Sequence, residues 1–364
     1  MKIAFLHFWT FRMRRGVETM VVSLANELAN LGHDISIVTA SPTVEPLVKP
    51  DARVRVQAYP TFRYFEFFTI APFYAVNLLA QKYDVVMVFF ADFGEGLALR
   101  LIEPYFKSRL VLNLTFPLES APHRYRAYTR WKFHQKAEII VADARYTATR
   151  GQEYLKRPVE FLPSGTDPQR FHPDNNLRLE ARRQLGFRDD EIILLNVAAL
   201  EKRKGIWRVI EALPQIRAQI PSIRYMVLGE GPEKEQLRQR VAELGLDTCV
   251  MFAGTSTNLP FFYNASDIFV MLSDAEAGSV ACLEAMSSDL PVVVANTGGF
   301  SDVVDETMGR IVDIRNQQEI AAAIIELAGN SALREQLGAA ARERILNQFS
   351  WSKIAEQLIQ ICQE

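Results

Sequence analysis

Short apolar runs alternate along the chain with longer segments whose apolar residues recur at helical spacing. Residues 2–6 are the first apolar run, residues 17–31 repeat apolar positions every three or four residues, and residues 35–38 are apolar again. Gly32 lies where a helix over 17–31 would end. Further strand candidates are residues 85–90, 110–114 and 139–141. Because strands that alternate with helices build parallel sheets, these residues predict a doubly wound α/β domain.

The same alternation restarts after residue 173. Strands are expected at residues 192–197, 224–228, 249–252, 268–272 and 291–294. Helices are expected at 206–220 and from the residues after Pro232 through Leu244. Residues 158–173 are rich in proline and poor in apolar residues, which is typical of a linker. We therefore expect two Rossmann-like domains that face a cleft, an acceptor domain over 1–172 and a donor domain over 173–349. The amphipathic residues 350–364 are expected to pack back on the first domain.

Composition favours a globular protein, and the charge is unevenly divided. Of 364 residues, 49% are hydrophobic and 23% are charged, which is enough apolar material for two cores. The net charge of −2 splits into +6 over residues 1–172 and −8 over residues 173–364. A basic first half favours an anionic partner, either a phosphate-bearing acceptor or an acidic lipid surface. An accidental split is the alternative.

The sequence predicts a cytoplasmic protein, peripheral on the inner face of the membrane. Cys249, Cys282 and Cys362 are scattered, which favours a reducing compartment over a disulfide framework. The opening residues lack the pattern of a signal peptide. The longest uncharged stretch, residues 67–80, contains Pro72 and is shorter than the roughly 20 residues that span a bilayer.

Two glutamates flank the strongest local signal for chemistry. Glu276 and Glu284 follow the apolar run 268–272, and Gly278 and Ser279 resemble the start of a helix that runs to Met286. A helix start offers free N–H groups and a positive dipole end, which suit a diphosphate. Eight helical residues cover about 12 Å, comparable to the reach from a sugar across a diphosphate to a ribose. The alternative is a surface acid and an unrelated acid on a helix face.

A cationic turn and a glycine lie at other expected strand ends. The turn is Lys202-Arg-Lys-Gly205, after the first strand of the second domain, and it could neutralise a leaving phosphate. Gly16 follows the first strand of the chain and permits close backbone approach to a ligand. A solvated basic loop and an ordinary turn are the alternatives. No two aspartates are separated by a single residue, so the metal-binding D-x-D motif is absent and no metal is expected.

Taken together, the motifs resemble the retaining glycosyltransferases of family 4, also called group 1. They occur in that family's order: Pro163-Ser-Gly-Thr-Asp167, Lys204-Gly205, Gly229-Glu-Gly-Pro232, Val250-Met-Phe-Ala-Gly254, Ala265-Ser-Asp267, the E-x7-E pair Glu276 and Glu284, Pro291-Val-Val293 and Gly298-Gly299. The first half matches more loosely, through Gly16-Val-Glu18 and residues 137–147. The resemblance implies a GT-B fold and a metal-independent transfer that retains configuration. A nucleoside diphosphate sugar would be the co-substrate, with no other cofactor.

The resemblance also assigns roles. Lys204 would contact the donor phosphates, Glu284 would hold the ribose hydroxyls, and Glu276 would face the donor sugar as the catalytic residue. The implied donor-binding residues are Gly16, Lys204, Arg203, Phe252, Thr255, Glu276, Gly278, Ser279, Val280 and Glu284. Of these, Phe252 to Thr255 would lie along the nucleobase.

Four positions depart from the family pattern. The usual Gly-Arg-Leu is Ala198-Ala-Leu200 here, so Arg203 or Lys202 would have to replace its arginine. The usual Gly-Phe-Gly after the first glutamate is Ala277-Gly-Ser279, which affects the identity of the sugar. Thr115 or Phe116 replaces a first-domain histidine, and Arg15 replaces a glycine.

Basic and aromatic residues interleave in the first domain. They occur over 123–136 and in the first loop, and they could lie on an anionic membrane or grip a phosphorylated acceptor. An exposed amphipathic helix with core aromatics is the alternative. The candidates are Arg12, Arg15, Thr115, Arg124, Arg126, Arg130 and Trp131. Nucleic acid is not expected, because the whole chain is slightly acidic.

The predicted function is transfer of a hexose-type sugar to a lipid-linked, saccharide or small-molecule acceptor in glycan or glycolipid synthesis. A sugar-nucleotide epimerase or hydrolase is one alternative, and it would act on the donor without an acceptor. A non-catalytic nucleotide-sugar binder is the other, and the missing arginine favours it.

Overall fold

The computed structural model describes residues 1–364 except 14–15, 63–65, 90–92, 116–132 and 364. The chain forms two compact units, which are described separately below. The first contains residues Met1–Ser164 and Trp351–Glu364, and the second contains Gly165–Ser350.

The first unit is built on a seven-stranded parallel sheet in the order β3-β2-β1-β4-β5-β6-β7. The strands are β1 (Lys2–Leu6), β2 (Asp34–Ala40), β3 (Arg55–Tyr59), β4 (Val85–Phe89), β5 (Arg109–Leu114), β6 (Ile139–Ala142) and β7 (Glu160–Phe161). Strands β1, β4 and β5 are buried almost throughout, as expected for central strands of a parallel sheet that is covered on both faces.

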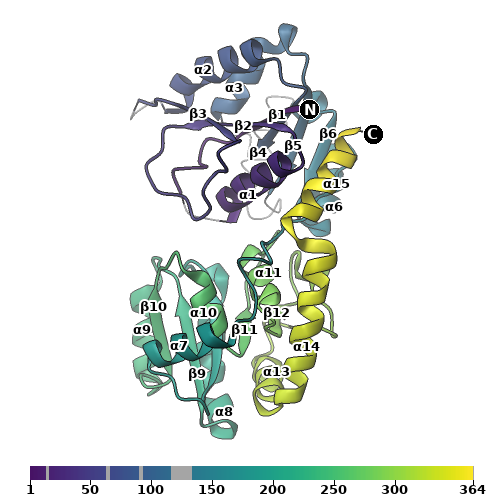
Figure 1. Ribbon diagram of the computed structural model, residues 1–364. Helices are drawn as coiled ribbons and strands as arrows, with labels where there is room; N and C mark the ends of the chain where they lie inside the picture. The colour runs from purple at the N-terminus through teal and green to yellow at the C-terminus, as the bar shows by residue number, and fades with distance from the viewer. Residues whose placement is uncertain (14–15, 63–65, 90–92, 116–132, 364) are drawn as a thin grey trace. The chain divides into compact units, whose positions relative to one another are not determined.

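Helices cover both faces of this sheet. Figure 1 shows α1 (Gly16–Asn30) and α15 (Trp351–Gln363) on one face, with α2 (Glu66–Gln81) and α3 (Phe93–Ile102) on the other. Each face has its own apolar core. Among the described residues of this unit, the remaining helices are η1 (Glu103–Tyr105), α5 (Phe133–Lys136) and α6 (Arg145–Leu155).

The second unit is built on a six-stranded parallel sheet in the order β10-β9-β8-β11-β12-β13. Its strands are β8 (Ile192–Val197), β9 (Ile223–Leu228), β10 (Val250–Gly254), β11 (Ile268–Met271), β12 (Val292–Ala295) and β13 (Gly309–Val312). Strand order reverses between β8 and β11, so this is the point where open α/β sheets bind ligands.

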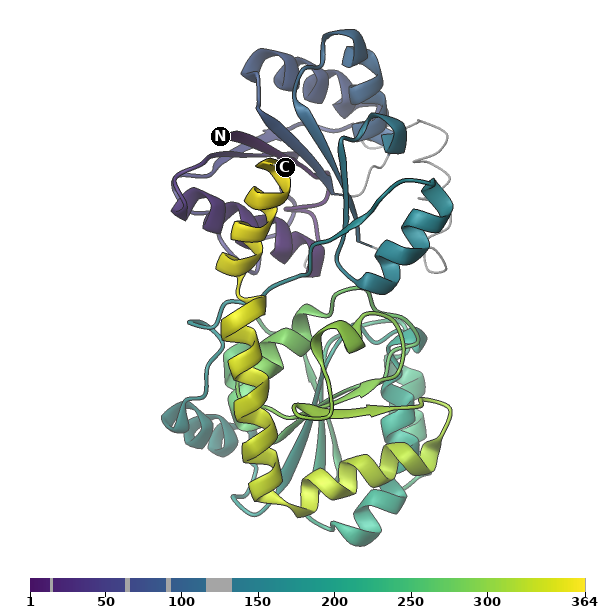
Figure 2. The same ribbon diagram turned by 90° about the vertical axis from the view of Figure 1, so that its right-hand side faces the viewer.

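Two layers of helices enclose the second sheet. One core lies under α8 (Ile206–Gln219), α9 (Lys234–Glu243) and α13 (Gln317–Gly329). The other lies under α7 (Asn175–Leu185), α10 (Leu259–Ala265) and α11 (Val280–Ser287). Figure 2 shows the last helices of this unit, α13 and α14 (Ser331–Arg344), which are joined by a tight turn at Asn330. Short helices complete it: η2 (Lys202–Lys204), α12 (Phe300–Val303) and the π-helical turn Ile345–Phe349.

The two parallel-sheet, Rossmann-like domains of the predicted fold class are confirmed, and two features differ from the expectation: three strands and the boundary between the domains. Strands β3, β7 and β13 were not predicted: β3 and β13 are not continuous apolar runs, and β7 has only two residues and lies in the predicted linker. The second unit begins at Gly165, eight residues before the predicted start at residue 173, because Phe171 is buried in that unit's core. At the other end of the chain, α15 packs against α1 in the first unit.

Candidate active site

The loops that follow β8 and β9 touch at the carboxyl edge of the second sheet. Gly229 has a φ of +153°, and a Cβ there would lie 1.9 Å from the carbonyl oxygen of Ala198. A Cβ on Gly231 would lie 2.5 Å from the carbonyl oxygen of Leu200. The Gly-Glu-Gly-Pro motif therefore serves close packing of two backbone segments, which a side chain would prevent.

The cationic turn Lys202–Lys204 is fastened to the loop after β11. Gly205 ends the turn with a φ of +69°, and a Cβ on it would lie 1.9 Å from the carbonyl oxygen of Leu272. The buried Arg208 donates to that oxygen at 3.1 Å and to the Asp274 carboxylate at 2.6 Å. The Asp274 amide in turn donates to the carbonyl oxygen of Arg203 at 2.8 Å. These contacts hold the turn and the loop in a fixed position relative to each other.

This fastening brings Lys204 and Glu276 together. The Lys204 ammonium donates to Glu276 Oε1, and the two side chains are only 15% and 11% exposed. Seventy-two positions separate the two residues along the chain. Such a shielded pair is costly to break, because either partner alone would be a poorly solvated charge.

Two glycines hold the backbone of Glu276. Gly298 has a φ of +64°, and a Cβ there would lie 2.2 Å from the carbonyl oxygen of Glu276 and 2.7 Å from its nitrogen. The Gly299 amide donates to the same carbonyl oxygen at 2.8 Å. The Gly298-Gly299 motif, which the sequence shows only as a family feature, therefore fixes the position of a site carboxylate.

Helix α11 begins where the sequence predicts. Ser279 is its N-cap residue, and its hydroxyl accepts a hydrogen bond from the Cys282 amide at 3.3 Å. Gly278 and Val280 flank this cap, so the first free N–H groups of the helix lie within four residues of Glu276 along the chain. That arrangement suits a diphosphate group.

Glu284 is buried inside α11 and is held by a residue that the sequence did not single out. Tyr263, from α10, donates to Glu284 Oε2 at 2.8 Å, and the other carboxylate oxygen receives no hydrogen bond from the part of the chain that the structure describes. Burial raises the pKa of the Glu284 carboxyl to about 7, while the hydrogen bond from Tyr263 and the charge of Arg170 act to lower it. Burial also holds the pKa of Tyr263 well above its usual value, so its hydroxyl stays protonated and can donate.

The predicted nucleobase residues lie beside the Gly229 loop. The Gly229 amide donates to the carbonyl oxygen of Gly254 at 2.7 Å. Phe252 is half-buried, with the Arg238 guanidinium 5.8 Å from its ring centre, and Thr255 is exposed. A half-buried ring next to an exposed polar residue can accept a planar base, and this role stays a prediction.

The candidates to replace the family arginine differ in their contacts. Arg203 pairs with Glu201 at 2.8 Å, and about half of its side chain is exposed. Lys202 is exposed as well, and so is Ala199, which stands at the arginine's place in the motif. The basic residue of this turn that contacts the site glutamate is therefore Lys204.

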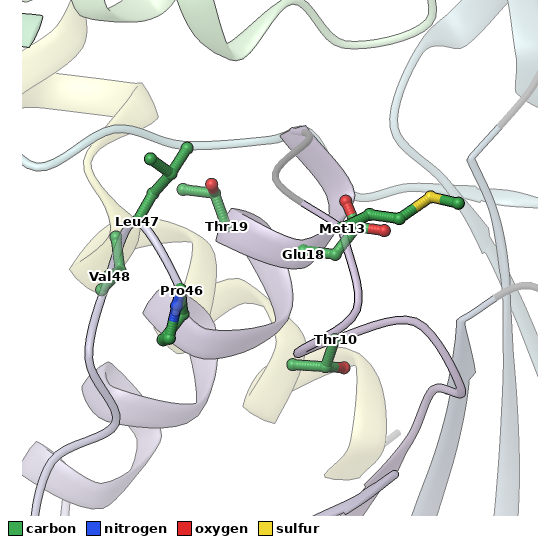
Figure 3. A pocket seen from close by; sticks show the side chains of 7 residues that line it. All are labelled: Thr10, Met13, Glu18, Thr19, Pro46, Leu47 and Val48. Carbon is green, nitrogen blue, oxygen red and sulfur yellow. The ribbon is translucent and has the colours of Figure 1, made fainter. Parts of the chain in front are cut away.

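The first unit places the other candidates around its own sheet edge. Gly16 is exposed at the start of α1, and two later residues of that helix, Glu18 and Thr19, help to line a small hollow (Figure 3). The hollow is lined by Thr10, Met13, Glu18, Thr19, Pro46, Leu47 and Val48. Glu18 is buried there, although the sequence noted it only as part of a motif.

Two acceptor candidates are described and the others are not. Arg12 pairs with Glu66 at 3.0 Å and donates to Thr61 at 3.0 Å. Thr115 is buried directly after β5, and its hydroxyl has no hydrogen-bond partner among the described residues. Outside those residues lie Arg15, Phe116, Arg124, Arg126, Arg130 and Trp131.

Several curated proteins are similar in sequence. A GDP-mannose-dependent alpha-(1-6)-phosphatidylinositol monomannoside mannosyltransferase of Mycobacterium tuberculosis is 32% identical over 212 residues, which cover 55% of this chain and 54% of that protein. The lipopolysaccharide core biosynthesis glycosyltransferase LpsD of Rhizobium meliloti is 32% identical over 57% of each chain. The chain thus spans little more than half the length of these relatives. The N-acetyl-alpha-D-glucosaminyl L-malate synthase of Bacillus anthracis is 23% identical over 92% of this chain and 90% of its own.

Solved structures share the fold over the whole chain. The Anabaena protein HepE, in complex with UDP and glucose, superposes with a TM-score of 0.84 at 19% identity and full coverage of both chains. Sucrose-phosphate synthase from Thermosynechococcus elongatus superposes with a TM-score of 0.82 at 21% identity, over 99% of this chain and 98% of its own.

Two family models match the chain in succession. The model described as Glycosyltransferase Family 4 matches residues 14–170, and the one described as Glycosyl transferases group 1 matches residues 178–344. The boundary between the matches falls close to the boundary between the two units, and the second match contains the Lys204–Glu276 pair and Glu284. The chain belongs to the group 1 glycosyltransferases of family 4 and has their two-domain GT-B fold.

Proposed function

We propose that this protein transfers a hexose from a nucleoside diphosphate sugar to a lipid-linked or saccharide acceptor, with retention of configuration and without a metal ion. In this reaction the bond from the anomeric carbon to the diphosphate breaks, and a bond to an acceptor oxygen forms. The proton of the acceptor hydroxyl passes to the leaving diphosphate, so atoms and charge balance.

The observation that carries the proposal is the contact between Lys204 and Glu276 beside the start of α11. A diphosphate at this helix start would take Lys204 as its counterion and thereby free Glu276. The released carboxylate would then accept hydrogen bonds from the sugar and offset positive charge that develops at the anomeric carbon. Glu284, one oxygen of which receives no bond from the described residues, would hold the ribose.

The acceptor class is inferred from the relatives. The mycobacterial relative is named for a phosphatidylinositol mannoside, and the rhizobial relative for the lipopolysaccharide core. Both names describe glycolipids, so a lipid-linked saccharide is the acceptor that we propose. The mycobacterial relative depends on GDP-mannose, which makes guanosine diphosphate the first donor base to test.

The test is a thermal-shift screen of GDP, UDP and ADP, each with and without a chelator. A bound nucleotide raises the unfolding temperature by mass action, and we expect one base to do so equally in chelator. The matching nucleotide sugar and a lipid-linked acceptor are then incubated, and proton NMR of the first product reports the anomeric linkage. Complete loss of binding in chelator, or an inverted linkage, would contradict the proposal.

A non-catalytic nucleotide-sugar binder is a second candidate, because exposed Ala199 stands where the family carries arginine. Without that cation, Lys204 alone would have to neutralise the leaving diphosphate. Binding of the donor without turnover over several acceptors would favour this candidate. Turnover by the unaltered protein would eliminate it.

A further inference from the structure

Helix α2 contains the longest uncharged stretch of the chain, residues 67–80, and its apolar residues do not all lie in the core. Its inner face packs on the first sheet through Ile70, Ala71, Tyr74, Ala75 and Leu78. An ordinary surface helix would carry polar residues on its opposite face.

The outer face of α2 is also apolar. Among the side chains of α2 that the structure describes, the exposed ones are Phe68, Pro72, Phe73, Val76, Leu79 and Ala80, none of which is charged or polar. Val76 is 68% exposed and Phe68 is 53% exposed, so large side chains project into solvent. We call this set of six residues the outer face of α2. A contiguous apolar surface of this kind usually marks an interaction site.

Segments next to α2 also carry exposed apolar side chains. Phe62, just before α2, is 64% exposed. Helix α3 runs beside α2 in both views, and Leu101 at its end and Tyr105 in η1 are 55% and 70% exposed. Aromatic and aliphatic side chains thus dominate the exposed surface of these helices.

The bordering charges are mostly positive. Lys82 directly follows α2 and Lys107 follows η1, and both are exposed. The carboxylate of Glu103 is shared between Arg100 and Lys136. An apolar face with cations at its border matches a phospholipid surface, in which acyl chains lie beneath anionic headgroups.

A protein partner fits this face less well. Protein interfaces carry about one hydrogen bond per 100–200 Å² and a polar rim, whereas the outer face of α2 offers no side-chain donor or acceptor. None of the helices in the described part of the chain has the length and apolarity to cross a bilayer, so α2 would lie along the surface.

The outer face is connected to the acceptor candidates. Glu66, in the first turn of α2, pairs with Arg12 of the loop after β1, and Arg12 also holds Thr61. The beginning of α2 therefore lies next to the loop that leads into Gly16. A helix resting on a bilayer would place this loop at the headgroups, where the sugar of a lipid-linked acceptor is found.

We propose that the outer face of α2 docks on a phospholipid bilayer that contains anionic lipid and so presents a lipid-linked acceptor to the first unit. This inference rests on the proposed function for the nature of the acceptor, but the docking itself is measured without any sugar. It differs from adsorption through the basic residues 123–136, because apolar insertion persists at high salt whereas charge attraction is screened.

The test compares the full chain with two double variants in vesicle sedimentation. Phe68→Glu/Val76→Glu alters the outer face, and Leu179→Glu/Leu346→Glu makes the same charge change at exposed leucines of the second unit. Vesicles contain phosphatidylcholine and phosphatidylglycerol, at low and at high salt. We expect the outer-face variant to partition about tenfold or more weakly at both salts, and the control variant to stay within about twofold of the parent.

Several results would overturn the docking. They are no binding by the parent chain, an equal loss in both variants, or binding that vanishes at high salt. A concentration-dependent dimer of the parent that Phe68→Glu/Val76→Glu dissociates would show a protein interface instead. If the glutamate variant does not fold by circular dichroism, Phe68→Gln/Val76→Gln replaces it.

A nucleotide measurement separates this inference from the proposed function. In lipid-free solution both double variants should bind the nucleoside diphosphate as the parent does. A parent chain that binds vesicles but no nucleotide would refute the function and leave the docking standing. A parent chain that binds nucleotide but no vesicles would refute the docking and leave the proposed function standing.

Discussion

The Glu284 carboxyl group is buried and receives one hydrogen bond from the described residues, that of Tyr263. Its protonation state therefore determines the pH range in which it can bind a ribose. The carboxyl group of a glutamate can accept hydrogen bonds on both oxygens when it is ionised. When it is protonated, one of the two oxygens carries a proton and acts as a donor. Because burial raises the pKa of Glu284 to about 7, the ionised fraction changes near neutral pH. The hydroxyl of Tyr263 favours the ionised form, which makes Tyr263 a positioning residue for the nucleotide site.

Nucleotide affinity should therefore fall as the pH drops below about 7, and Tyr263→Phe should move this transition to higher pH. The ring contacts with Phe171 and Phe269 would remain in the variant, so its fold should persist. Calorimetry between about pH 5.5 and 9 measures the profile. Tyr225→Phe is the matched control, because the buried Tyr225 hydroxyl has no hydrogen-bond partner in the described residues. A profile unchanged by Tyr263→Phe would contradict the role.

Glu284→Gln should stabilise the protein above neutral pH while weakening nucleotide binding. The folded pKa of about 7 lies above the ordinary value of 4.5, so the folded state binds the proton more tightly and Glu284 costs stability as the pH rises through this window. We expect the variant to be about 3 kcal/mol more stable than the parent at pH 8, and the difference to shrink to near zero below pH 4.5. Urea unfolding at several pH values measures it; a constant difference would refute the argument.

Glu276→Gln should separate turnover from nucleotide binding. The amide cannot offset charge at the anomeric carbon, so turnover should fall about a hundredfold or more. Because Glu276 competes with a diphosphate for Lys204, affinity for the free nucleotide should stay equal or rise a few-fold. Steady-state kinetics and calorimetry on the folded variant test both parts. Parent-like turnover would remove Glu276 from the reaction.

At the scale of elements, the site depends on loops that only glycine allows to touch. The loop after β12 lies on the Glu276 backbone at Gly298, and the turn before α8 lies on the end of β11 at Gly205. These contacts join three strand ends into one platform. A side chain at either glycine would move a loop, and therefore a charged group of the site.

Gly298→Ala should reduce turnover by about a hundredfold, because even a shift of about 1 Å in a site group can have that effect. Gly245→Ala is the matched control: both glycines have a φ of +64°, but a Cβ on Gly245 would meet nothing within 4 Å. Backbone strain should cost both variants about 1–2 kcal/mol of stability, and Gly298→Ala should lose more, because its Cβ would press on the Glu276 backbone; thermal unfolding measures both losses. Equal turnover in the two variants would show that the contact with Glu276 is unimportant.

At the scale of the whole molecule, the chain completes its first unit with its last helix. Trp351, Ile354 and Leu358 of α15 are buried with α1 in one core of that unit. Residues that are more than two hundred positions apart are linked there, as in the bond from the Arg109 guanidinium to the carbonyl oxygen of Cys362.

Truncation after Ser350 should therefore unfold the first unit and leave the second intact. Each large buried side chain contributes about 1.5–3 kcal/mol, so losing three exhausts much of the 5–15 kcal/mol that stabilises a typical domain. Limited proteolysis should cut the first unit and spare residues 165–350. A truncated chain that resists cleavage throughout would contradict this dependence.

The sequence by itself determined most of the order of the elements and the location of the candidate site. Buried parallel strands such as β4 and β8 are continuous apolar runs, and the start of α11 is marked by Gly278 and Ser279, so local patterns predicted them. The spacing of Glu276 and Glu284 likewise indicated two carboxylates at one helix start.

Only the tertiary structure decided which groups meet. Lys204 reaches Glu276 because separate strand ends converge at one sheet edge, and Tyr263 reaches Glu284 because α10 and α11 share one core. No local spacing in the sequence records such long-range contacts. Periodicity also cannot say which apolar faces another element covers. Most residues of α2 are apolar and suit a core, yet the single sheet beneath the helix covers one face and leaves Phe68 and Val76 exposed.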